Sequence, residues 1–139
     1  MDAADVCPGN KVYLPVNVQG ALFHIGDGHA TQGDGEVSGV ATEIPTRGTL
    51  SFEVLKSKVI GTPRIESEEY IMAVGSARPM EDAARIAFYE LILWLEQDFG
   101  IDRLTAYQLC SQVARVRLAN MVDIQYSVVA KFPKKYLPK

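Results

Sequence analysis

The sequence has few cysteines and no long run of apolar or basic residues. Its two cysteines, Cys7 and Cys110, lie far apart in the chain, which fits neither a disulfide framework nor the close spacing of zinc ligands. The longest apolar stretch, residues 91–95, falls far short of the ~20 residues that span a bilayer. The longest basic run is the pair Lys134 and Lys135, and the formal net charge is −3. These features argue against a nucleic-acid or membrane partner.

The chain also lacks the marks of a secretory signal. Residues 1–5 contain neither a basic region nor an apolar region, so we expect a cytoplasmic protein. The length of 139 residues, with 47% hydrophobic and 22% charged residues, is typical of one globular domain with a single core. We predict one domain over residues 1–139, with a β-rich part at 1–75 and a helix-helix-strand part at 76–139.

Alternating apolar residues predict several short strands in the first half. In residues 11–18 every second residue is apolar, which is the period of a half-buried strand, and Pro15 places it at a sheet edge or a bulge. Further short strands are predicted at residues 21–25, 36–44, 50–54, 59–63 and 69–74. No helical pattern interrupts them, which favours an antiparallel sheet in a sandwich or barrel.

The second half has a helical period. Apolar residues recur at three- or four-residue steps from Glu81, and Gly100 is suited to end that helix. Asp102 can cap a second helix that runs to about Val116. The expected apolar stripe of this second helix is Leu104, Leu109, Val113 and Val116. Residues 120–132 are predicted as one or two strands. The overall prediction is an α+β fold, with a mainly antiparallel sandwich- or barrel-like first half followed by two helices and terminal strands.

Two side chains of this half have predicted structural roles. Cys110 lies in the middle of a predicted helix, where a thiol usually packs and has no cation to activate it. Arg117 is predicted to form an ion pair with Asp123, with Arg115 as a competing partner. Neither prediction assigns chemistry to the second half.

Residues 26–36 and their neighbours hold most of the side chains that could perform chemistry. The segment contains four glycines and no apolar residue except Ala30, which is typical of a loop. Both histidines and four carboxylates lie in or near it: His24, Asp27, His29, Asp34, Glu36 and Glu43. In extended backbone the pairs 27/29 and 34/36 each project to one side. Imidazole with carboxylates suits Zn²⁺ and similar divalent ions, which polarise carbonyl groups and activate water.

The same residues allow other interpretations. Asp-Gly repeats are also common in exposed, solvated turns. The order of the acidic residues does not meet the pattern of a calcium-binding EF-hand, and acidic groups in residues 26–31 disfavour a phosphate-binding loop. Nothing marks Ser38 or Ser111 as the nucleophile of a catalytic triad. The residues alone leave a metal-binding loop and a solvated turn as alternatives.

Several stretches of the sequence together match a family signature. They are residues 13–16, 20–23 and the loop Gly26-Asp27-Gly28-His29-Ala30 with Gln32-Gly33-Asp34-Gly35-Glu36-Val37, followed by residues 39, 41, 43, 107–111, 117, 122–123 and 132–134. The chain thereby resembles the acetamidase/formamidase family, whose loop reads closely as G-D-x-H-A-x-Q-G-D-G-E. Members of that family are much longer, so the chain resembles their C-terminal portion without their β-rich N-terminal half.

The resemblance implies a hydrolase that cleaves the C–N bond of short linear amides, such as formamide and acetamide, and releases ammonia and a carboxylate. It also implies a divalent metal ion, Zn²⁺ first with Ca²⁺ as another candidate. The expected assembly is a homo-oligomer, or a complex with a partner chain that supplies the N-terminal half. The alternative is a non-catalytic domain or subunit that retains the fold, with or without a metal site.

Residue roles follow from the same resemblance. Asp27 and His29 are the expected metal ligands, and Glu36, Glu43 and Asp34 are the expected catalytic carboxylates. We hypothesise that one of the two glutamates accepts a proton from metal-activated water and later delivers it to the leaving nitrogen. The expected apolar wall of the substrate pocket is Phe23 and Leu22. His24 is either an additional ligand or a surface substitution.

Overall fold

The computed structural model describes residues 2–138. Among these residues, no helix is both long enough and apolar enough to cross a membrane. The elements in chain order are β1 (Lys11–Tyr13), the 3₁₀ turn η1 (Asp34–Glu36), β2 (Arg64–Glu66), β3 (Tyr70–Ala77), α1 (Met80–Phe99), α2 (Arg103–Val113), β4 (Arg115–Asn120), β5 (Tyr126–Pro133) and the 3₁₀ turn η2 (Lys134–Tyr136). The predicted α+β class is confirmed.

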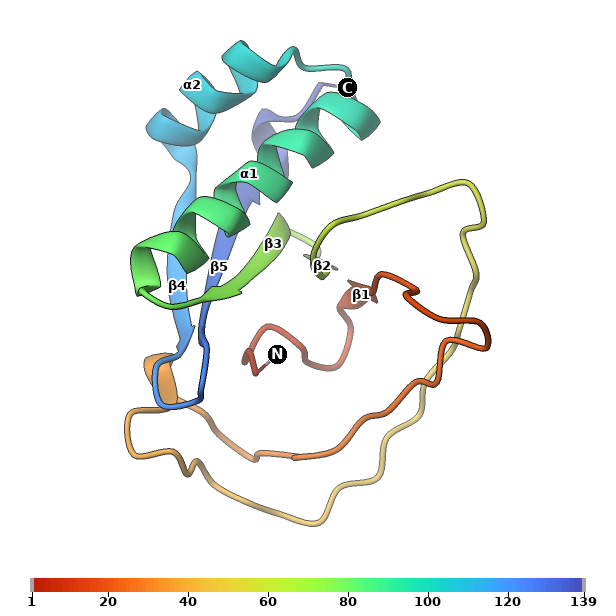
Figure 1. The fold of residues 1–139 in the computed structure, drawn as a ribbon, viewed down its shortest axis with the longest axis vertical. Coiled ribbons are helices and arrows are strands. Elements are labelled where there is room, and N and C mark those ends of the chain that lie inside the picture. Colours follow the sequence, from red (N-terminus) through yellow and green to blue (C-terminus); the bar gives the residue numbers. More distant parts are fainter. Residues whose placement is uncertain (1, 139) are drawn as a thin grey trace.

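The strands form one five-stranded antiparallel sheet in the order β1-β2-β3-β5-β4 (Figure 1). Strands β3 and β5 pair along their whole length, from Tyr70 opposite Pro133 to Ala77 opposite Tyr126. Strand β3 corresponds to the strand predicted at residues 69–74, and β5 corresponds to part of the strand region predicted at residues 120–132. Among the described residues β1 pairs with β2 alone, so the other edge of β1 is free.

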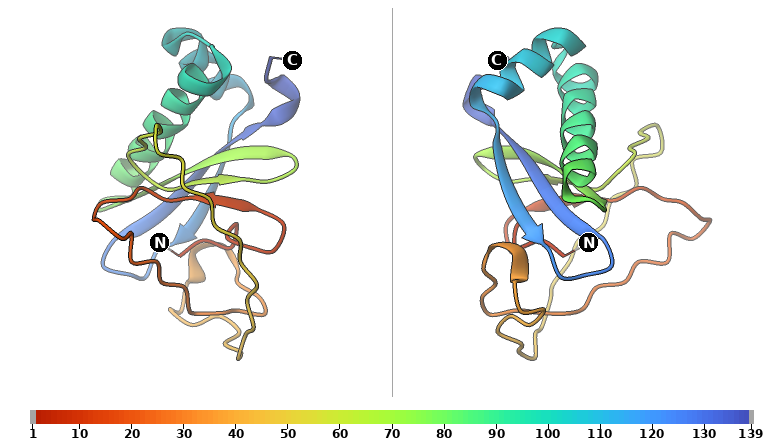
Figure 2. Two further views of the ribbon diagram at one scale, coloured as in Figure 1. Left: turned by 90° about the vertical axis from the view of Figure 1, so that its right-hand side faces the viewer. Right: turned by 60° about the vertical axis from the view of Figure 1, so that its left-hand side comes forward.

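Helix α1 covers one face of this sheet (Figure 2). In β3, Ile71 and Ala73 pack in the cluster formed with the helices, whereas Met72 and Val74 pack in a second cluster on the other face, together with Ala3. This alternation is that of a strand buried on both faces. The main core therefore lies between the sheet and the helices, and the N-terminal residues cover part of the opposite face.

Two glycines set the position and the length of α1. At Gly75 in β3 a side chain would overlap the backbone of Ala83 and Ala87, so the absence of a Cβ lets the helix approach the sheet closely. At Gly100 the backbone is left-handed, with φ 66°, and its N–H donates to the carbonyl of Glu96. This is the predicted end of the helix.

Helix α2 begins as the sequence predicts. The Asp102 carboxylate accepts hydrogen bonds from the backbone N–H groups of Leu104 and Thr105, at 3.1 and 3.2 Å. The helix ends at Val113, earlier than predicted, because the chain turns there into β4. Residues 115–120, which were expected partly as helix, belong to the edge of the sheet.

The predicted apolar stripe of α2 is wrong for two residues. Leu104 is 66% exposed and Val116, which lies in β4, is 54% exposed. The helix buries Ala106 and Cys110 instead, because small side chains permit a close crossing with α1. Burial raises the pKa of the Cys110 thiol to about 11. The predicted packing role of this cysteine is confirmed.

Residues 14–63, hereafter the long loop, connect β1 to β2 (Figure 1). The strand predicted at 11–18 stops at Tyr13, and the strands predicted at 21–25, 36–44, 50–54 and 59–63 do not form in this described segment. Its regular features are η1 and one isolated bridge between His29 and Glu43. An alternating pattern becomes a strand only where a neighbouring strand accepts its backbone hydrogen bonds. The second sheet of a sandwich is therefore absent from the described residues.

Candidate metal centre

A short antiparallel pairing within the long loop places His29 opposite Glu43. The N–H of Ala30 donates to the carbonyl of Thr42 at 2.9 Å, and the N–H of Thr42 donates to the carbonyl of Thr31 at 3.1 Å. Residues directly opposite each other in such a pair project to the same side. The pairing therefore brings together an imidazole and a carboxylate that are distant in the sequence.

The backbone near this pairing is constrained at several positions. Asp27 and Glu36 have left-handed backbones, with φ 60° and 43°, a conformation that non-glycine residues rarely adopt. At Gly28 a side chain would overlap that of Thr46. Unusual backbone geometry of this kind concentrates at functional sites, where the surrounding structure maintains it.

Asp27, His29 and Glu43 form a cluster whose ligand atoms all lie within 4.8 Å of one another. The Nε2 atom of His29 lies 3.2 Å from Oδ1 of Asp27 and 3.0 Å from Oε1 of Glu43. The imidazole is only 6% exposed, whereas the side chains of Asp27 and Glu43 are 71% and 48% exposed. The cluster is thus anchored on the inside by His29 and open to solvent on its carboxylate side.

Gln32 fixes the orientation of the His29 ring. The Nδ1 atom of His29 lies 3.1 Å from Oε1 of Gln32, while Nε2 of Gln32 donates to Oδ1 of Asp2 at 3.0 Å. Because the Gln32 oxygen only accepts, Nδ1 carries a proton and Nε2 faces the carboxylates of Asp27 and Glu43. The hydrogen bond to Gln32 and these two carboxylates raise the pKa of His29. Such an arrangement needs positive charge at Nε2, either a proton or a divalent ion. The donor set therefore fits a metal ion.

Glu36 lies on the inner side of this cluster. Its Oε1 atom is 3.9 Å from Nε2 of His29, and its side chain is 7% exposed. Its Oε2 atom accepts a hydrogen bond of 3.0 Å from Nδ2 of Asn120. Hydrogen bonding to the Asp2 carboxyl group and burial raise the pKa of Glu36 to about 7. A carboxyl group with this pKa can accept and return a proton near neutral pH.

Asn120, at the end of β4, connects the network to the sheet. Its Nδ2 donates to Oδ2 of Asp2 at 3.1 Å and to Glu36, while its Oδ1 accepts from the N–H groups of Val122 and Asp123, both at 3.0 Å. Asn120 is 1% exposed. Sequence reasoning missed both Asn120 and Asp2. The signal for Asn120 was available, since an Asn before a turn commonly bonds to the backbone two or three residues later.

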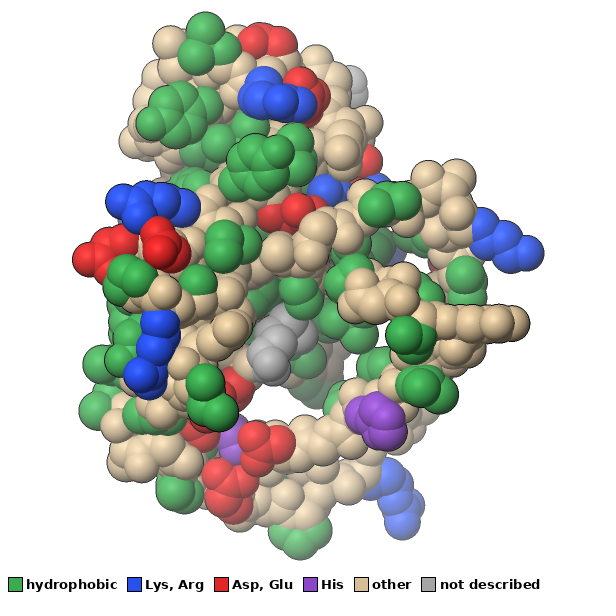
Figure 3. Space-filling view, in the orientation of Figure 1, with side chains coloured by type: hydrophobic (Ala, Val, Ile, Leu, Met, Phe, Trp, Pro, Cys, Tyr) green, Lys and Arg blue, Asp and Glu red, His purple; other side chains and the backbone are tan. Residues whose placement is uncertain are grey.

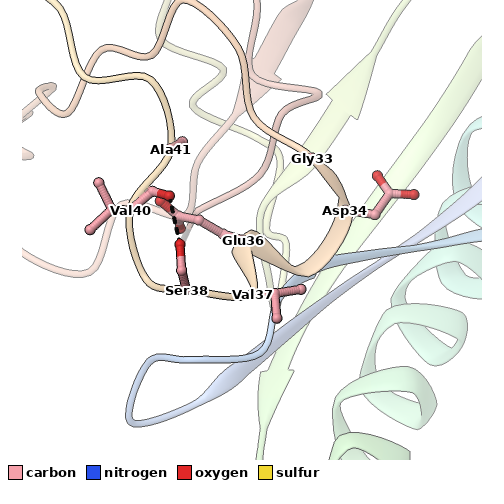
Figure 4. Close-up of a pocket in the computed structure, with 7 residues that line it drawn as sticks. All are labelled: Gly33, Asp34, Glu36, Val37, Ser38, Val40 and Ala41. Atoms are coloured by element: carbon pink, nitrogen blue, oxygen red, sulfur yellow. Dashed lines mark hydrogen bonds between the residues drawn. The ribbon is translucent and has the colours of Figure 1, made fainter.

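Asp34 does not join the cluster. The prediction that Asp34 and Glu36 project to one side assumed extended backbone, but residues 34–36 form the turn η1, in which Gly35 has φ 82°. Figure 4 shows Asp34 pointing away from the side chain of Glu36. Arg117 binds Asp34 instead, with 2.9 Å between Nε and Oδ1.

The predicted ion pair between Arg117 and Asp123 is wrong. Besides Asp34, Arg117 contacts Asp5, with 3.4 Å between Nη1 and Oδ1. Asp123 lies in the turn after β4, where its backbone carbonyl accepts a hydrogen bond from Arg78. The long loop and the N-terminal residues bring carboxylates to Arg117 that are far from it in the sequence.

An open depression of about 330 Å³ borders Glu36. Its lining residues are Gly33, Asp34, Glu36, Val37, Ser38, Val40 and Ala41 (Figure 4). The N–H of Ala41 donates to Oε1 of Glu43 at 3.2 Å, which joins the rim of the depression to the metal-ligand cluster. Its apolar surface comes from Val37, Val40 and Ala41.

Leu22 and Phe23, the predicted apolar wall, do not line this depression. Phe23 packs edge-on against Phe52, with ring centroids 4.8 Å apart, and Leu22 is 69% exposed. Their role in substrate binding stays a prediction. His24 is exposed and lies outside the group of candidate ligands.

Comparison with known proteins points to one family. The profile of the Acetamidase/Formamidase family matches residues 1–136. A protein of Schizosaccharomyces pombe named as a formamidase is 42% identical over 59 residues, which is 42% of this chain and 14% of that protein.

Solved structures give the same result. An acetamidase from Yersinia enterocolitica is 44% identical and superposes with a TM-score of 0.85 over 100% of this chain. An acetamidase from Bacillus halodurans is 30% identical, with a TM-score of 0.90 over 97% of this chain. The chain spans 42% and 46% of those two chains, respectively. The match over nearly all of its length shows that the chain belongs to the acetamidase/formamidase family.

Proposed function

We propose that this chain carries the hydrolytic centre of an amidase, which cleaves the C–N bond of short linear amides such as formamide and acetamide. The family match and relatives named acetamidase and formamidase support this class of reaction. The observation that carries the proposal is the convergence of Asp27, His29 and Glu43 within 4.8 Å, with the buried Glu36 carboxylate 3.9 Å from His29.

Asp27, His29 and Glu43 would hold a divalent metal ion, which we propose is Zn²⁺. One imidazole nitrogen with carboxylate oxygens is a donor set that suits Zn²⁺. Ca²⁺ takes six to eight oxygen ligands and fits this set less well. The distance of 3.0 Å from Glu43 to Nε2 of His29 favours a ligand role for Glu43 over a role as proton acceptor. When bound, the ion supplies Lewis acidity, which activates water and polarises the amide carbonyl.

Glu36 is the proposed proton carrier. Its Oε1 atom faces the cluster, and the hydrogen bond from Asn120 to Oε2 holds the carboxylate in that orientation. Glu36 accepts a proton from the attacking water as the water oxygen bonds to the amide carbon. It then returns the proton to the amide nitrogen, the C–N bond breaks, and ammonia and the carboxylic acid leave; the acid afterwards loses its proton to give the carboxylate. Its burial limits proton exchange with bulk water.

Metal content tests the ligand assignment. The purified chain should retain a divalent ion, measured by inductively coupled plasma mass spectrometry. His29→Ala should lose it, because this change removes the nitrogen donor. His24→Ala is the matched control, since His24 is exposed and outside the cluster, and it should retain the ion. Equal metal content in the wild-type and His29→Ala chains would overturn the assignment.

The second candidate function is a non-catalytic subunit that retains the metal site. The exposed apolar residues of the long loop favour this role, because they indicate a surface that binds another polypeptide. Ammonia release distinguishes the two functions. A catalytic chain releases ammonia from formamide or acetamide when metal is bound, whereas a non-catalytic subunit binds metal without releasing ammonia.

A further inference from the structure

A second depression, of about 270 Å³, lies where the end of α2, the start of β4 and the end of β5 meet. We call it the α2–β4 depression. Its polar lining residues are Tyr70, Gln112, Arg115, Lys135 and Tyr136. Strand β4 runs from Arg115 to Asn120, so at a rise of ~3.3 Å per residue the depression lies ~16 Å from the network around Glu36. It is therefore separate from the candidate metal centre.

Regular elements of the fold hold the rim of the α2–β4 depression in place. Arg115 lies opposite Lys131 in the ladder between β4 and β5. The N–H of Lys134 donates to the carbonyl of Glu69 at 2.8 Å, which ties the turn η2 to the residue that precedes β3. Helix α2 leads directly into β4. The depression is thus formed by elements with fixed neighbours, as preformed ligand sites commonly are.

The two cations of the depression have no carboxylate partner among the described residues. The neighbouring cations do: Lys131 and Lys134 each bind a carboxylate, with 2.5 and 2.6 Å between nitrogen and oxygen. On the face of the molecule shown in Figure 3, some Lys and Arg side chains likewise lie beside Asp or Glu. Within residues 2–138, by contrast, Arg115 and Lys135 line a depression that contains no acidic lining residue. A positive depression is thereby formed in a chain whose net charge is −3.

The lining side chains supply hydrogen-bond donors as well as charge. The guanidinium of Arg115 is a planar fork that can bind two oxygen atoms of one anion, and the ammonium of Lys135 adds a point charge. The Lys135 ammonium lies 4.9 Å from the centre of the Tyr136 ring, a cation–π contact that restricts its position. The amide of Gln112 and the hydroxyl of Tyr70 are neutral donors. Charge and donors therefore converge on one anion-sized space.

We propose that the α2–β4 depression binds the phosphate group of a small phosphate monoester. Arg115 and Lys135 together match the ~1.5–2 negative charges of such a group at pH 7, whereas a carboxylate carries only one. The C-terminal end of α2 borders the depression and carries partial negative charge, so both cations are needed to attract an anion. Val113 and Pro133 also line the depression and offer apolar contacts to the organic part of the molecule.

Two-dimensional ¹H–¹⁵N NMR of the labelled chain tests the proposal, with phenyl phosphate as the probe. Titration at constant ionic strength should shift the amides of residues 112–115 and 134–136, and these shifts should saturate. Benzoate has the same ring but one negative charge and should bind ~5-fold more weakly. Inorganic phosphate should also bind more weakly than phenyl phosphate, because it leaves the apolar lining uncovered.

Three results would overturn the proposal. Shifts that do not saturate would show that the depression is not a binding site. Shifts confined to residues 27–43 would place the probe at the candidate metal centre instead. Benzoate or inorganic phosphate binding as tightly as phenyl phosphate would contradict a monoester ligand. The readout is binding at named residues, so the outcome does not depend on amide hydrolysis.

Arg115→Gln and Lys135→Gln test the two charges separately. Each should weaken the binding of phenyl phosphate ~5-fold, and the chain should still fold because both side chains are exposed. Lys56→Gln is the matched control, since Lys56 is exposed in the long loop and outside the depression. It removes the same charge and should leave binding unchanged. Equal weakening by all three substitutions, or no weakening by Arg115→Gln, would contradict the assignment.

Discussion

Replacement of Asn120 tests whether the network around Glu36 is held together as the structure indicates. Asn120 is 1% exposed, donates to Asp2 and Glu36, and accepts from the backbone N–H groups of Val122 and Asp123. Asn120→Ala removes all four hydrogen bonds together.

The expected loss of stability follows from these bonds. Hydrogen bonds with Glu36, Gln32 and Asn120, in that order of size, hold the pKa of Asp2 below its ordinary value, although burial opposes the shift. A hydrogen bond to such an ionised group contributes ~1.5–3 kcal/mol, and a neutral one ~1 kcal/mol. Solvent reaches the exposed turn after β4 and recovers part of the loss. We therefore expect Asn120→Ala to lower the free energy of unfolding by ~3 kcal/mol.

Urea unfolding followed by circular dichroism measures this loss. Asn17→Ala is the control, since Asn17 is exposed, and it should change the free energy of unfolding by less than ~0.5 kcal/mol. Asn120→Asp separates the two roles of the side chain, because it keeps the acceptor for the turn but replaces the donor with a carboxylate beside Asp2 and Glu36. It should lose at least ~2 kcal/mol. An Asn120→Asp chain as stable as the wild type would show that the donor side of Asn120 does not stabilise the network.

Three further predictions concern the fold. Gly75→Ala forces a Cβ into the backbone of α1 and should lower the free energy of unfolding by ~2–4 kcal/mol in urea titrations. Gly48→Ala is the control: Gly48 has open space around it, so this change should leave the free energy of unfolding unaltered. Hydrogen bonds from Thr105 and Leu104 hold the pKa of Asp102 below its ordinary value of 3.8. The helix cap therefore contributes its full stability above pH 3.8 and loses it as the pH falls through the lower pKa of the folded state. In Asp102→Ala, urea titrations over this pH range should lack this part of the pH dependence of stability. Burial raises the pKa of Cys110 to about 11, so Cys110 should react with Ellman's reagent far more slowly at pH 8 than the exposed Cys7; equal rates would contradict its packed position.

The sequence predicted best those features that depend on local signals. The left-handed end of α1 at Gly100 and the cap of α2 at Asp102 are each specified by a few adjacent residues. The Asp27 and His29 side chains also approach each other, as predicted, although the prediction assumed extended backbone and Asp27 has a φ of 60°. The strands predicted in the long loop failed because alternation describes a face of a strand but does not supply its pairing partner.

The rest of the candidate site depends on contacts that are distant in the sequence. Glu43 reaches His29 through the bridge across the loop, and Asn120 reaches Glu36 from the end of β4. Asp34 left the predicted group because Gly35 adopts φ 82° and turns the chain. Periodicity and spacing in the sequence do not encode these approaches, so they required the folded chain.

We propose that the cluster of Asp27, His29 and Glu43, with Glu36 beside it, is a hydrolytic metal centre. Ammonia release from formamide and acetamide tests this centre, measured before chelation, after chelation and after Zn²⁺ is restored. We expect ammonia release to stop on chelation, to return with Zn²⁺, and to be absent in Glu36→Gln although the metal stays bound. Release that persists without metal, or that Glu36→Gln leaves unchanged, would contradict it.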